Sequence, residues 1–426
     1  MKKAAIIVET MLGVGHMRRA AAMARGLQAN DLEVHIITSE NSYRKGQSFD
    51  YGKAIFPEFL PSFERNPDTG TANLPPLGFS RDEIHAKRRD NMISHLRQIR
   101  PDTVITESWP FGRGRYDSEF TPAIELVKNE FPQTQIFCLI REVLCFMESR
   151  IGTNAEMRVV DLINRYFDGV ISTSDQRYFV LGDTFPCSHL IRKPIFYPGF
   201  FVNKAAPRSE ILETEREVIV SSGGGYTVNS CDLFEAAIKT KTKTEFNNNP
   251  WRFFVSNDCP DVEFARLQQM AEVHRTEHGS ITVQRFSTAF QNHMANAAAI
   301  ISEVGQTMAE AIDVKTTACN RAKDPVTIVA VPRYNPNESG VQEQVFKAQA
   351  YQSKGLLSVA MPVDIASPEV FAALINAEKA RSIAYTQNAE AADIKVDAAN
   401  IAADWIKNRM EGPRRHRNLV STGMRL

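Results

Sequence analysis

The feature that most constrains the fold is a regular alternation of short apolar, β-branched runs with longer helical patterns along all 426 residues. Strands that alternate with helices predict βαβ units and parallel sheets. The expected strands are residues 4–8, 33–38, 102–106, 135–140 and 169–173 in the first half, and residues 217–221, 251–255, 281–284, 298–302 and 326–331 in the second. Helical patterns lie between them, for example at residues 16–28, 81–99, 229–240 and 342–353. The sequence therefore predicts an α/β protein.

A proline-rich segment divides this alternation into two halves. Residues 185–208 hold four prolines and a central Gly199, and we interpret them as the connection between two domains. The expected domains are residues 1–200 and 201–388, each an α/β unit of about 200 residues. A further helix is expected at residues 389–410, packed back on the first domain, and a basic tail at residues 411–426.

Composition excludes several classes of protein. Lys and Arg total 50, as do Asp and Glu, so the zero net charge argues against a globally basic nucleic-acid binder. The six cysteines are scattered without a C-x-x-C pair, which excludes a zinc ribbon and fits a reducing, cytoplasmic location. Glu9 interrupts the first apolar run, so we expect no signal peptide, and no stretch of 18 apolar residues predicts a membrane span.

The first candidate site follows the opening strand at Gly13-Val14-Gly15-His16. Glycines allow a sharp turn there, and the N-terminus of the following helix favours an anion. His16 would lie where ligands bind in such sheets, and its neutral imidazole is a candidate base near pH 7. Arg18 replaces the third glycine of the dinucleotide motif, and no acidic residue stands at the end of the second strand, so that interpretation is weak. A plain strand-to-helix turn is the alternative.

Two further strand ends in the first half carry charged residues. Glu107 and Arg113 lie in a segment directly after the strand at 102–106, and Arg141 and Glu142 directly follow the strand at 135–140. Because the carboxyl ends of parallel strands meet at one edge, both pairs are candidates for a cleft. The alternative in each case is a simple ion pair.

The second half carries three candidate segments in order. Ser222, Gly223, Gly224 and Gly225 form a loop that exposes several N–H groups to a phosphate, or else a flexible turn. Gly305, Gln306, Thr307 and Glu310 open a helix that could bind phosphate and ribose, or else form a helix cap with a solvated carboxylate. Glu343 and Gln344 could contact sugar hydroxyls, or else form an acidic helix N-terminus.

The helical pattern at residues 81–99 is basic, with Lys87, Arg88, Arg89 and Arg97 beside regularly spaced apolar residues. We interpret it as a solvated amphipathic face. Peripheral contact with a membrane or an anionic acceptor is the alternative.

In their order along the chain, these segments resemble the GT-B glycosyltransferases, especially the MurG-like group. The glycine loop, the turn Val283-Gln284-Arg285-Phe286, the segment from Gly305 to Glu310, Val331-Pro332 and the helix containing Glu343-Gln344 match the second domain. Gly13-Val14-Gly15-His16 and the segment from Glu107 to Arg113 resemble the first domain of a less characterised branch. The resemblance covers nearly the whole chain and implies two Rossmann-like domains that face each other across a cleft.

The resemblance also implies a role for each candidate residue. Gly223, Gly224, Gly225 and Thr307 would face the donor diphosphate, Phe286 the uracil, Glu310 the ribose, and Glu343 with Gln344 the sugar. The acceptor side would be lined by His16, Glu107, Arg113, Arg141 and Glu142. Further candidates for substrate binding, without a more specific role, are Gly13, Gly15, Ser222, Gly305 and Gln306. His16 is the first candidate for the catalytic base, and Glu107 or Glu142 the second. Glu343 stands where the MurG-like group has glutamine, so the sugar stays open.

These observations predict a glycosyltransferase that moves a hexosyl group from a nucleotide sugar, most simply a UDP-hexose, to an unidentified acceptor. The chain contains no Asp-x-Asp pair, so we expect no metal and no other cofactor, with helix N-termini stabilising the leaving diphosphate. The alternatives are a nucleotide-sugar epimerase or hydrolase on the same fold, an NAD(P)-dependent oxidoreductase, and a noncatalytic sensor.

Overall fold

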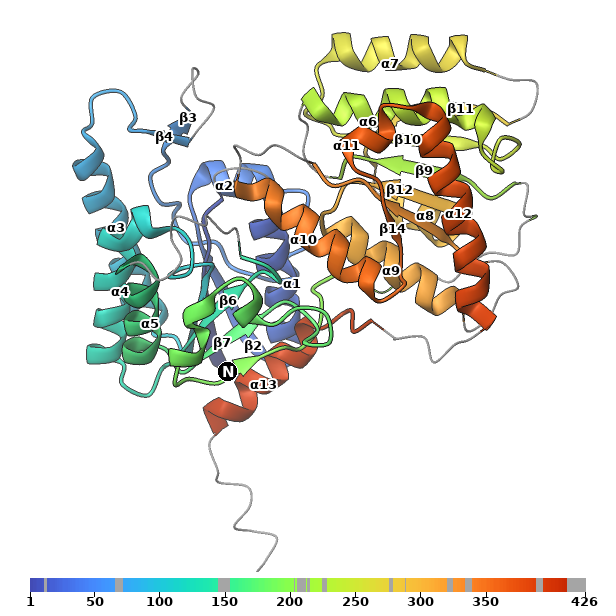
Figure 1. Cartoon of the computed structure of the whole chain (residues 1–426). Coiled ribbons are helices and arrows are strands. Elements are labelled where there is room, and N and C mark those ends of the chain that lie inside the picture. The colour runs from blue at the N-terminus through green and yellow to red at the C-terminus, as the bar shows by residue number, and fades with distance from the viewer. Residues whose placement is uncertain are drawn as a thin grey trace, which may run out of the picture.

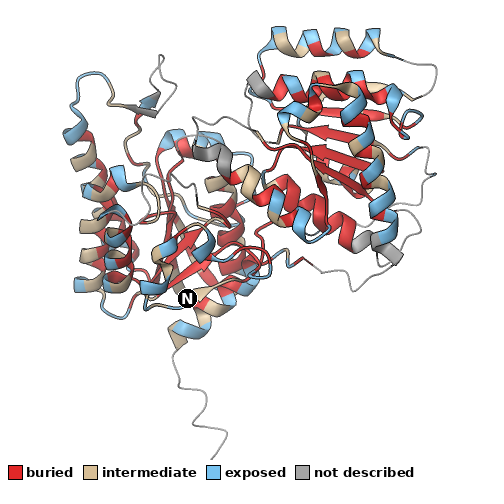
Figure 2. Cartoon of the chain, viewed as in Figure 1, coloured by how far each residue is buried: buried red, intermediate tan, exposed pale blue. Residues whose placement is uncertain are grey.

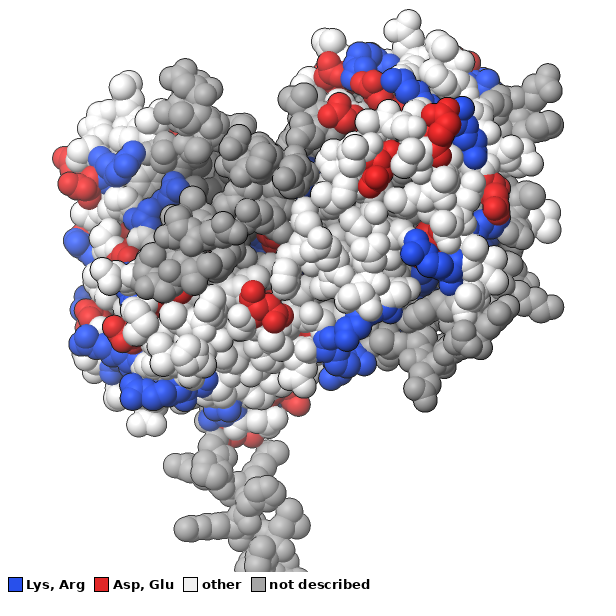
Figure 3. Space-filling view, viewed as in Figure 1, with Lys and Arg blue, Asp and Glu red and all other residues white. Residues whose placement is uncertain are grey.

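The structure, a computed structural model, consists of two parallel sheets flanked by helices (Figure 1). It describes residues 1–10, 14–65, 72–144, 154–202, 204, 212, 215–223, 228–275, 279–287, 289–319, 325–333, 339–387 and 394–411. None of the helices within these ranges is long and apolar enough to cross a bilayer. Acidic and basic side chains are interspersed on the face shown in Figure 3.

The first sheet has the strand order β2-β1-β5-β6-β7-β8, with every neighbouring pair parallel. Its strands are β1 (Lys2–Ile7), β2 (Leu32–Ile37), β5 (Thr103–Glu107), β6 (Gln135–Ile140), β7 (Gly169–Ser172) and β8 (Ile195–Phe196). The accompanying helices are α1 (Gly15–Ala29), α2 (Glu40–Gly46), α3 (Arg81–Ile99), α4 (Asp117–Glu130) and α5 (Asn154–Tyr166). The central strands are apolar and buried because helices cover both faces of the sheet (Figure 2).

The second sheet repeats this plan, with the order β11-β10-β9-β12-β13-β14. Its strands are β9 (Val218–Ser221), β10 (Trp251–Val255), β11 (Ile281–Arg285), β12 (Ala299–Ser302), β13 (Thr327–Ala330) and β14 (Ser358–Val359). Its helices are α6 (Val228–Thr240), α7 (Asp261–Val273), α8 (Phe290–Ala295), α9 (Gln306–Cys319), α10 (Ser339–Ser353), α11 (Pro362–Ile365) and α12 (Pro368–Gln387). The ten strands expected from the sequence are all present, with ends that differ by at most two residues.

The proline-rich segment is more structured than expected. Its first part forms a short 3₁₀ helix, Pro186–Leu190, and another, Leu181–Asp183, lies just before the segment. Ile195–Phe196 then form β8, which pairs with β7 at the edge of the first sheet. The segment was expected to be a connection throughout, and that expectation is wrong for β8, because two residues were too few to show a strand period.

The last described helix, α13 (Ala399–Glu411), returns to the first sheet and lies along α1 (Figure 1). Its Trp405 ring stacks on Phe196 with a centroid distance of 4.8 Å.

The expected helix at 389–410 begins too early: residues 394–398 are not helical, and 389–393 lie outside the described residues. The non-helical part instead pairs with the interdomain segment, where the Phe200 N–H donates to the Lys395 carbonyl at 2.7 Å. The basic tail lies outside the described residues from position 412 onward.

The two halves are joined by an apolar cluster. Val143 and Phe179 from the first half pack with Tyr351 of α10, and the rings of Phe179 and Tyr351 lie 5.3 Å apart. The antiparallel hairpin of β3 (Glu64–Arg65) and β4 (Ala72–Leu74) lies apart from both sheets.

Candidate functional site

Each sheet has one point at which its strand order reverses, and both points carry candidate residues. In the first sheet β2 lies on one side of β1 and β5 on the other, so the chain turns back between β1 and β5. In the second sheet the corresponding point lies between β9 and β12. Ligands of open α/β sheets bind in the crevice at the carboxyl ends of the strands at such reversals. His16 lies in the helix after β1 and Glu107 ends β5, whereas Ser222 and Glu303 directly follow β9 and β12.

His16 and Glu107 form a hydrogen-bonded pair at the β1–β5 reversal. The His16 Nδ1 atom lies 2.6 Å from Glu107 Oε2. An ionised carboxylate only accepts hydrogen bonds, so we assign the Nδ1 proton to the imidazole as donor. Arg19, one turn further along α1, donates to Glu107 Oε1 from Nε at 2.9 Å and from Nη2 at 2.5 Å. This pairing holds the carboxylate charged and the imidazole in one orientation, with Nε2 left to accept a proton.

Burial sets the charge state of this pair. Removal from water lowers the pKa of His16 to about 4, although Glu107 acts in the opposite direction. Burial would raise the pKa of Glu107, but His16 and Arg19 outweigh it and hold that pKa well below its usual range. Near neutral pH the pair is therefore a neutral imidazole beside a carboxylate, which is the state that a general base requires.

The loop after β5 carries Arg113 into the same region. Ser108 and Arg113 both have φ of 66°, in the left-handed region. The Gly112 N–H donates to the Ser108 carbonyl at 2.7 Å, which holds the turn in place. The Nε and Nη2 atoms of Arg113 are buried and make no hydrogen bond. Burial lowers the pKa of the Arg113 guanidinium, which Glu107 and Glu9 partly offset.

The glycine loop after β9 is described only in part. Gly223 has φ of 72°, and its N–H donates to Ser221 Oγ at 3.0 Å. The Ser222 hydroxyl is buried and has no hydrogen-bond partner. Gly224 and Gly225 lie outside the described residues, as does Gly13 in the first half; Gly15 begins α1.

The helix that begins at Gln306 presents Glu310 to the first half of the chain. A Cβ at Gly305, just before this helix, would meet no atom within 4 Å, so the space around it is open. Arg18 of α1 donates to Glu310 Oε1, and Gln291 donates to the same oxygen at 3.2 Å. Thr307 is buried at the start of α9. Glu310 is thus held in an ion pair between the halves rather than solvated as a simple helix cap would be.

A second set of ion pairs joins the halves beside β6. Lys347 of α10 lies 2.7 Å from Glu142 Oε1 and 2.9 Å from Glu343 Oε1, and Arg141 also pairs with Glu343. Burial would raise the pKa of Glu142, but Lys347 and Arg141 lower it to about 2. A carboxylate so stabilised by cations is a weak proton acceptor, so the geometry favours His16 over Glu142 as base.

The remaining predicted donor residues follow β13 and the edge strand β11 of the second sheet. Gln344 Oε1 accepts from the Arg333 N–H at 2.9 Å. Phe286 follows β11, is 40% exposed, and its ring centroid lies 5.0 Å from that of Phe290.

Sequence reasoning missed a buried ionisable cluster after β12. Glu303 accepts from Ser230 Oγ at 2.8 Å and from Arg333, which follows β13. Burial raises the pKa of Glu303 to about 7, although Arg333 and Ser230 act to lower it. The position of Glu303 directly after a strand was the available signal. Arg19 was also missed, because its role depends on a partner 88 positions away.

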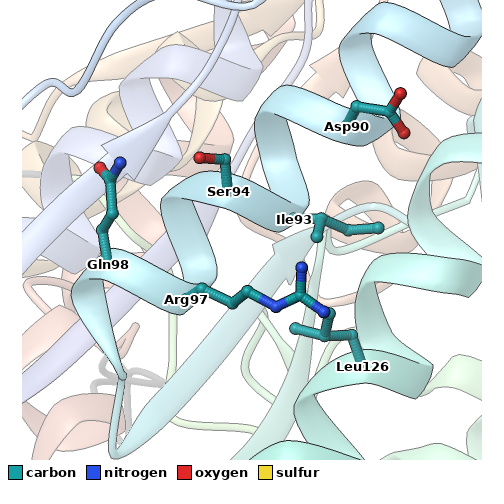
Figure 4. A pocket seen from close by; sticks show the side chains of 6 residues that line it. All are labelled: Asp90, Ile93, Ser94, Arg97, Gln98 and Leu126. Atoms are coloured by element: carbon teal, nitrogen blue, oxygen red, sulfur yellow. The ribbon is translucent and has the colours of Figure 1, made fainter.

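The basic face expected on α3 is partly wrong. Arg88 is fully buried and pairs with Glu119 at 2.9 Å and with Glu9 at 3.0 Å, because its side chain turns toward the sheet. A surface pocket does lie on this helix, between α3 and α4, lined by Asp90, Ile93, Ser94, Arg97, Gln98 and Leu126 (Figure 4). It belongs to the outer face of the helix layer and includes none of the strand-end residues.

Comparison with known proteins gives structural matches only. No family model matches the sequence, and no curated protein matches it. MurG of Acinetobacter baumannii is similar with a TM-score of 0.59 and 15% identity, covering 96% of this chain and 99% of that one. CalG4, the calicheamicin glycosyltransferase, is similar with a TM-score of 0.58 and 13% identity, covering 97% and 99%. The chain has the GT-B fold.

This fold is shared by more than one class of protein. UDP-GlcNAc 2-epimerase of Neisseria meningitidis, solved with UDP-GlcNAc bound, is similar with a TM-score of 0.55 and 11% identity, covering 96% of this chain and 99% of that one. The GT-B resemblance seen in the sequence is confirmed at the level of the fold. The residues of the site must therefore distinguish transfer from epimerisation.

Proposed function

We propose that this protein is a glycosyltransferase that moves a hexosyl group from a nucleotide sugar, most simply a UDP-hexose, to an acceptor hydroxyl without a metal ion. The observation that carries the proposal is the His16–Glu107 pair at the β1–β5 reversal. A neutral imidazole oriented by a buried carboxylate is a general base, and hydroxyl attack on a sugar needs one. Similar solved structures include MurG and CalG4, which supports this class.

The proposed reaction is a single displacement at the sugar. The acceptor oxygen forms a bond to C1 while its proton passes to His16 Nε2. The bond from C1 to the diphosphate oxygen breaks, and its electron pair leaves with the nucleoside diphosphate. Glu107 stabilises the imidazolium that forms, since an opposite charge nearby favours the protonated ring.

The leaving diphosphate would be stabilised by the second half of the chain. Ser222 supplies a buried hydroxyl without a partner, Gly223 begins the glycine loop, and α9 begins at Gln306 near Thr307. N–H groups at a helix start and a hydroxyl favour negative charge as it develops. Glu310 and Gln344 are the proposed contacts to ribose and sugar.

An epimerase is the second candidate, because the similar structures include UDP-GlcNAc 2-epimerases. It would use the same donor site and need no acceptor. Incubation with UDP-GlcNAc alone, followed by NMR of the sugar, separates the two: inversion at C2 at catalytic rates favours the epimerase, and nucleotide release that depends on an added hydroxyl compound favours transfer.

The test of the proposal combines ligand binding with a variant. UDP should raise the melting temperature, EDTA should leave that shift unchanged, and NAD⁺ should produce none; binding at 100 times Kd adds about 2.7 kcal/mol of stability. His16→Gln should reduce acceptor-dependent UDP release on the order of 10²–10⁴-fold while the UDP shift persists. His189→Gln, at an exposed histidine, is the matched control. Turnover of His16→Gln within a few-fold of the unaltered protein would remove His16 as base.

A further inference from the structure

Arg113 is a partly buried cation, and two of its nitrogen atoms make no hydrogen bond within the protein. Its Nε and Nη2 atoms are buried without a hydrogen-bond partner, in a loop that begins one residue after Glu107. A buried guanidinium with unmade hydrogen bonds is costly, so it is retained where a ligand supplies the acceptors. Its planar fork of N–H groups matches the two oxygens of a carboxylate or phosphate.

The neighbouring carboxylates are already occupied by other partners. Glu107 accepts from His16 and Arg19, and Glu9 accepts from Ser39 and Ser42 and pairs with Arg88. Both carboxylates raise the pKa of Arg113 electrostatically, without a hydrogen bond to it. Tyr116, Arg19 and His16 also interact with Arg113 electrostatically, and none of them forms a hydrogen bond with its Nε or Nη2 atom.

The backbone holds this side chain in place before any ligand arrives. Arg113 has φ of 66°, a conformation that residues other than glycine rarely adopt. Its carbonyl accepts from the Tyr116 N–H at 2.8 Å, and Tyr116 is itself buried against Arg88 with a ring distance of 5.1 Å. Such strain is retained where a position matters, and the Arg113 guanidinium is near enough to His16 to act on it electrostatically.

We propose that Arg113 binds an oxyanion of the acceptor, a carboxylate or a phosphate, close to the hydroxyl that receives the sugar. This rests on the proposed function, because it assigns the acceptor to the side of His16. It makes the acceptor an anionic hydroxyl compound, such as a hydroxy acid or a phosphorylated polyol. Arg113 would then select the acceptor and place its hydroxyl at His16 Nε2.

The test uses simple anions as probes, since the acceptor is unidentified. Phosphate and acetate are titrated separately into the ¹⁵N-labelled full chain, with NaCl at equal ionic strength as control, and the Arg113 Nε–H signal is identified by its loss in Arg113→Gln. A saturable shift with a millimolar Kd is expected, and whichever anion binds more tightly indicates the oxyanion of the acceptor. Anion affinity, followed by calorimetry, should fall about 30-fold or more in Arg113→Gln. Arg113→Lys should retain part of it, and Arg115→Gln, at an exposed arginine of the same loop, should retain it all.

Three results would overturn the proposal. The first is the absence of a saturable shift at 100 millimolar anion, and the second is an anion affinity in Arg113→Gln equal to that of the unaltered protein. The third is displacement of the anion by UDP, which would assign Arg113 to the donor diphosphate instead. UDP binding is measured on the same samples. If the unaltered protein does not bind UDP, the proposed function is contradicted. If it binds UDP but not the anion, only the assignment of Arg113 is contradicted.

Discussion

At the residue scale, the proton affinity of His16 reflects two opposing effects. Burial removes water from the imidazolium and lowers the pKa of His16, while the Glu107 carboxylate 2.6 Å away raises it. Burial prevails, so the ring is neutral over a wide pH range. In the proposed reaction it becomes charged when it receives the proton of the acceptor hydroxyl. Arg19 matters here because it keeps Glu107 ionised, and thus able to stabilise that charge.

The depressed pKa predicts an unusual pH profile. The proposed mechanism needs neutral His16, which is lost only as pH falls through about 4. A histidine with the ordinary pKa of about 6.5 would lose about 90% of its neutral form at pH 5.5. We therefore expect the limb of kcat/KM that belongs to His16 to lie below pH 5.5. Glu303, whose pKa is about 7, could add a limb of its own near neutral pH, so the pH profile of kcat/KM is also recorded for Glu303→Gln. An acidic limb that remains near pH 6.5 in this variant contradicts the prediction.

The pH dependence of folding stability tests the lowered pKa of His16 independently of activity. The unfolded chain binds a proton at His16 as pH falls through about 6.5, whereas the folded chain resists until about 4. His16 thus contributes stability that is present above pH 6.5 and is lost as pH falls toward 4. The melting temperature of His16→Gln should accordingly fall less steeply with acid over this window than that of the unaltered protein.

At the element scale, the contact between α1 and α13 depends on one glycine. A Cβ placed on Gly26 would lie 2.5 Å from the Ala399 carbonyl oxygen, so the backbones approach too closely for a side chain. Ala402 and Ile406 of α13 are buried in the same cluster as the apolar residues of α1. The last helix therefore completes the core of the first sheet, although it follows the second in sequence.

Gly26→Ala tests this packing. Alanine favours a helix by up to about 1 kcal/mol over glycine, but overpacking costs about 1–3 kcal/mol and should prevail. We expect a lower melting temperature in calorimetry, with UDP binding retained. Gly114→Ala is the control, because its Cβ would lie 4.0 Å from its nearest neighbour, Asp117 Oδ2, and its stability should change by less than about 0.5 kcal/mol. Equal melting temperatures for both variants would mean that α13 is not packed as described.

At the scale of the whole molecule, ion pairs hold the two halves together across their boundary. Arg18 pairs with Glu310, and Lys347 pairs with Glu142 from the opposite half. Arg18 stands where a dinucleotide motif has its third glycine, and the fold uses it as an interdomain contact. If Glu310 contacts the donor as proposed, the donor must compete with Arg18 for this carboxylate.

Lys347→Met should strongly destabilise the protein. It leaves the buried Glu142 and Glu343 without their ammonium partner, at a cost of about 3–5 kcal/mol. Thermal unfolding measures the loss, and adding Glu142→Gln to the variant should recover part of it because one unpaired charge is removed. Lys354→Met, at an exposed lysine just beyond α10, should leave the melting temperature nearly unchanged. A mild effect of Lys347→Met would show that the two carboxylates stay solvated or change partner.

The order of strands and helices, and the strand ends to within two residues, could be predicted from the sequence alone. Those features depend on local patterns, since side-chain period and turn residues act over a few positions; the strands at 135–140 and 251–255 match β6 and β10. His16, Glu107 and Ser222 could be chosen because parallel strands bring their carboxyl ends to one edge. Strands of two residues, such as β8, carry no period and were not found.

Which charges meet depends on the packing of distant segments. Glu303 pairs with Arg333 and Ser230, Arg88 is buried against Glu119, and Arg113 keeps two nitrogen atoms without hydrogen bonds; none of this follows from local pattern. Glu142 was expected in the acceptor site as a possible base, and the fold places Lys347, 205 positions away, against it. The physical reason is that an ionisable group takes its pKa and role from burial and from charges that only folding brings near.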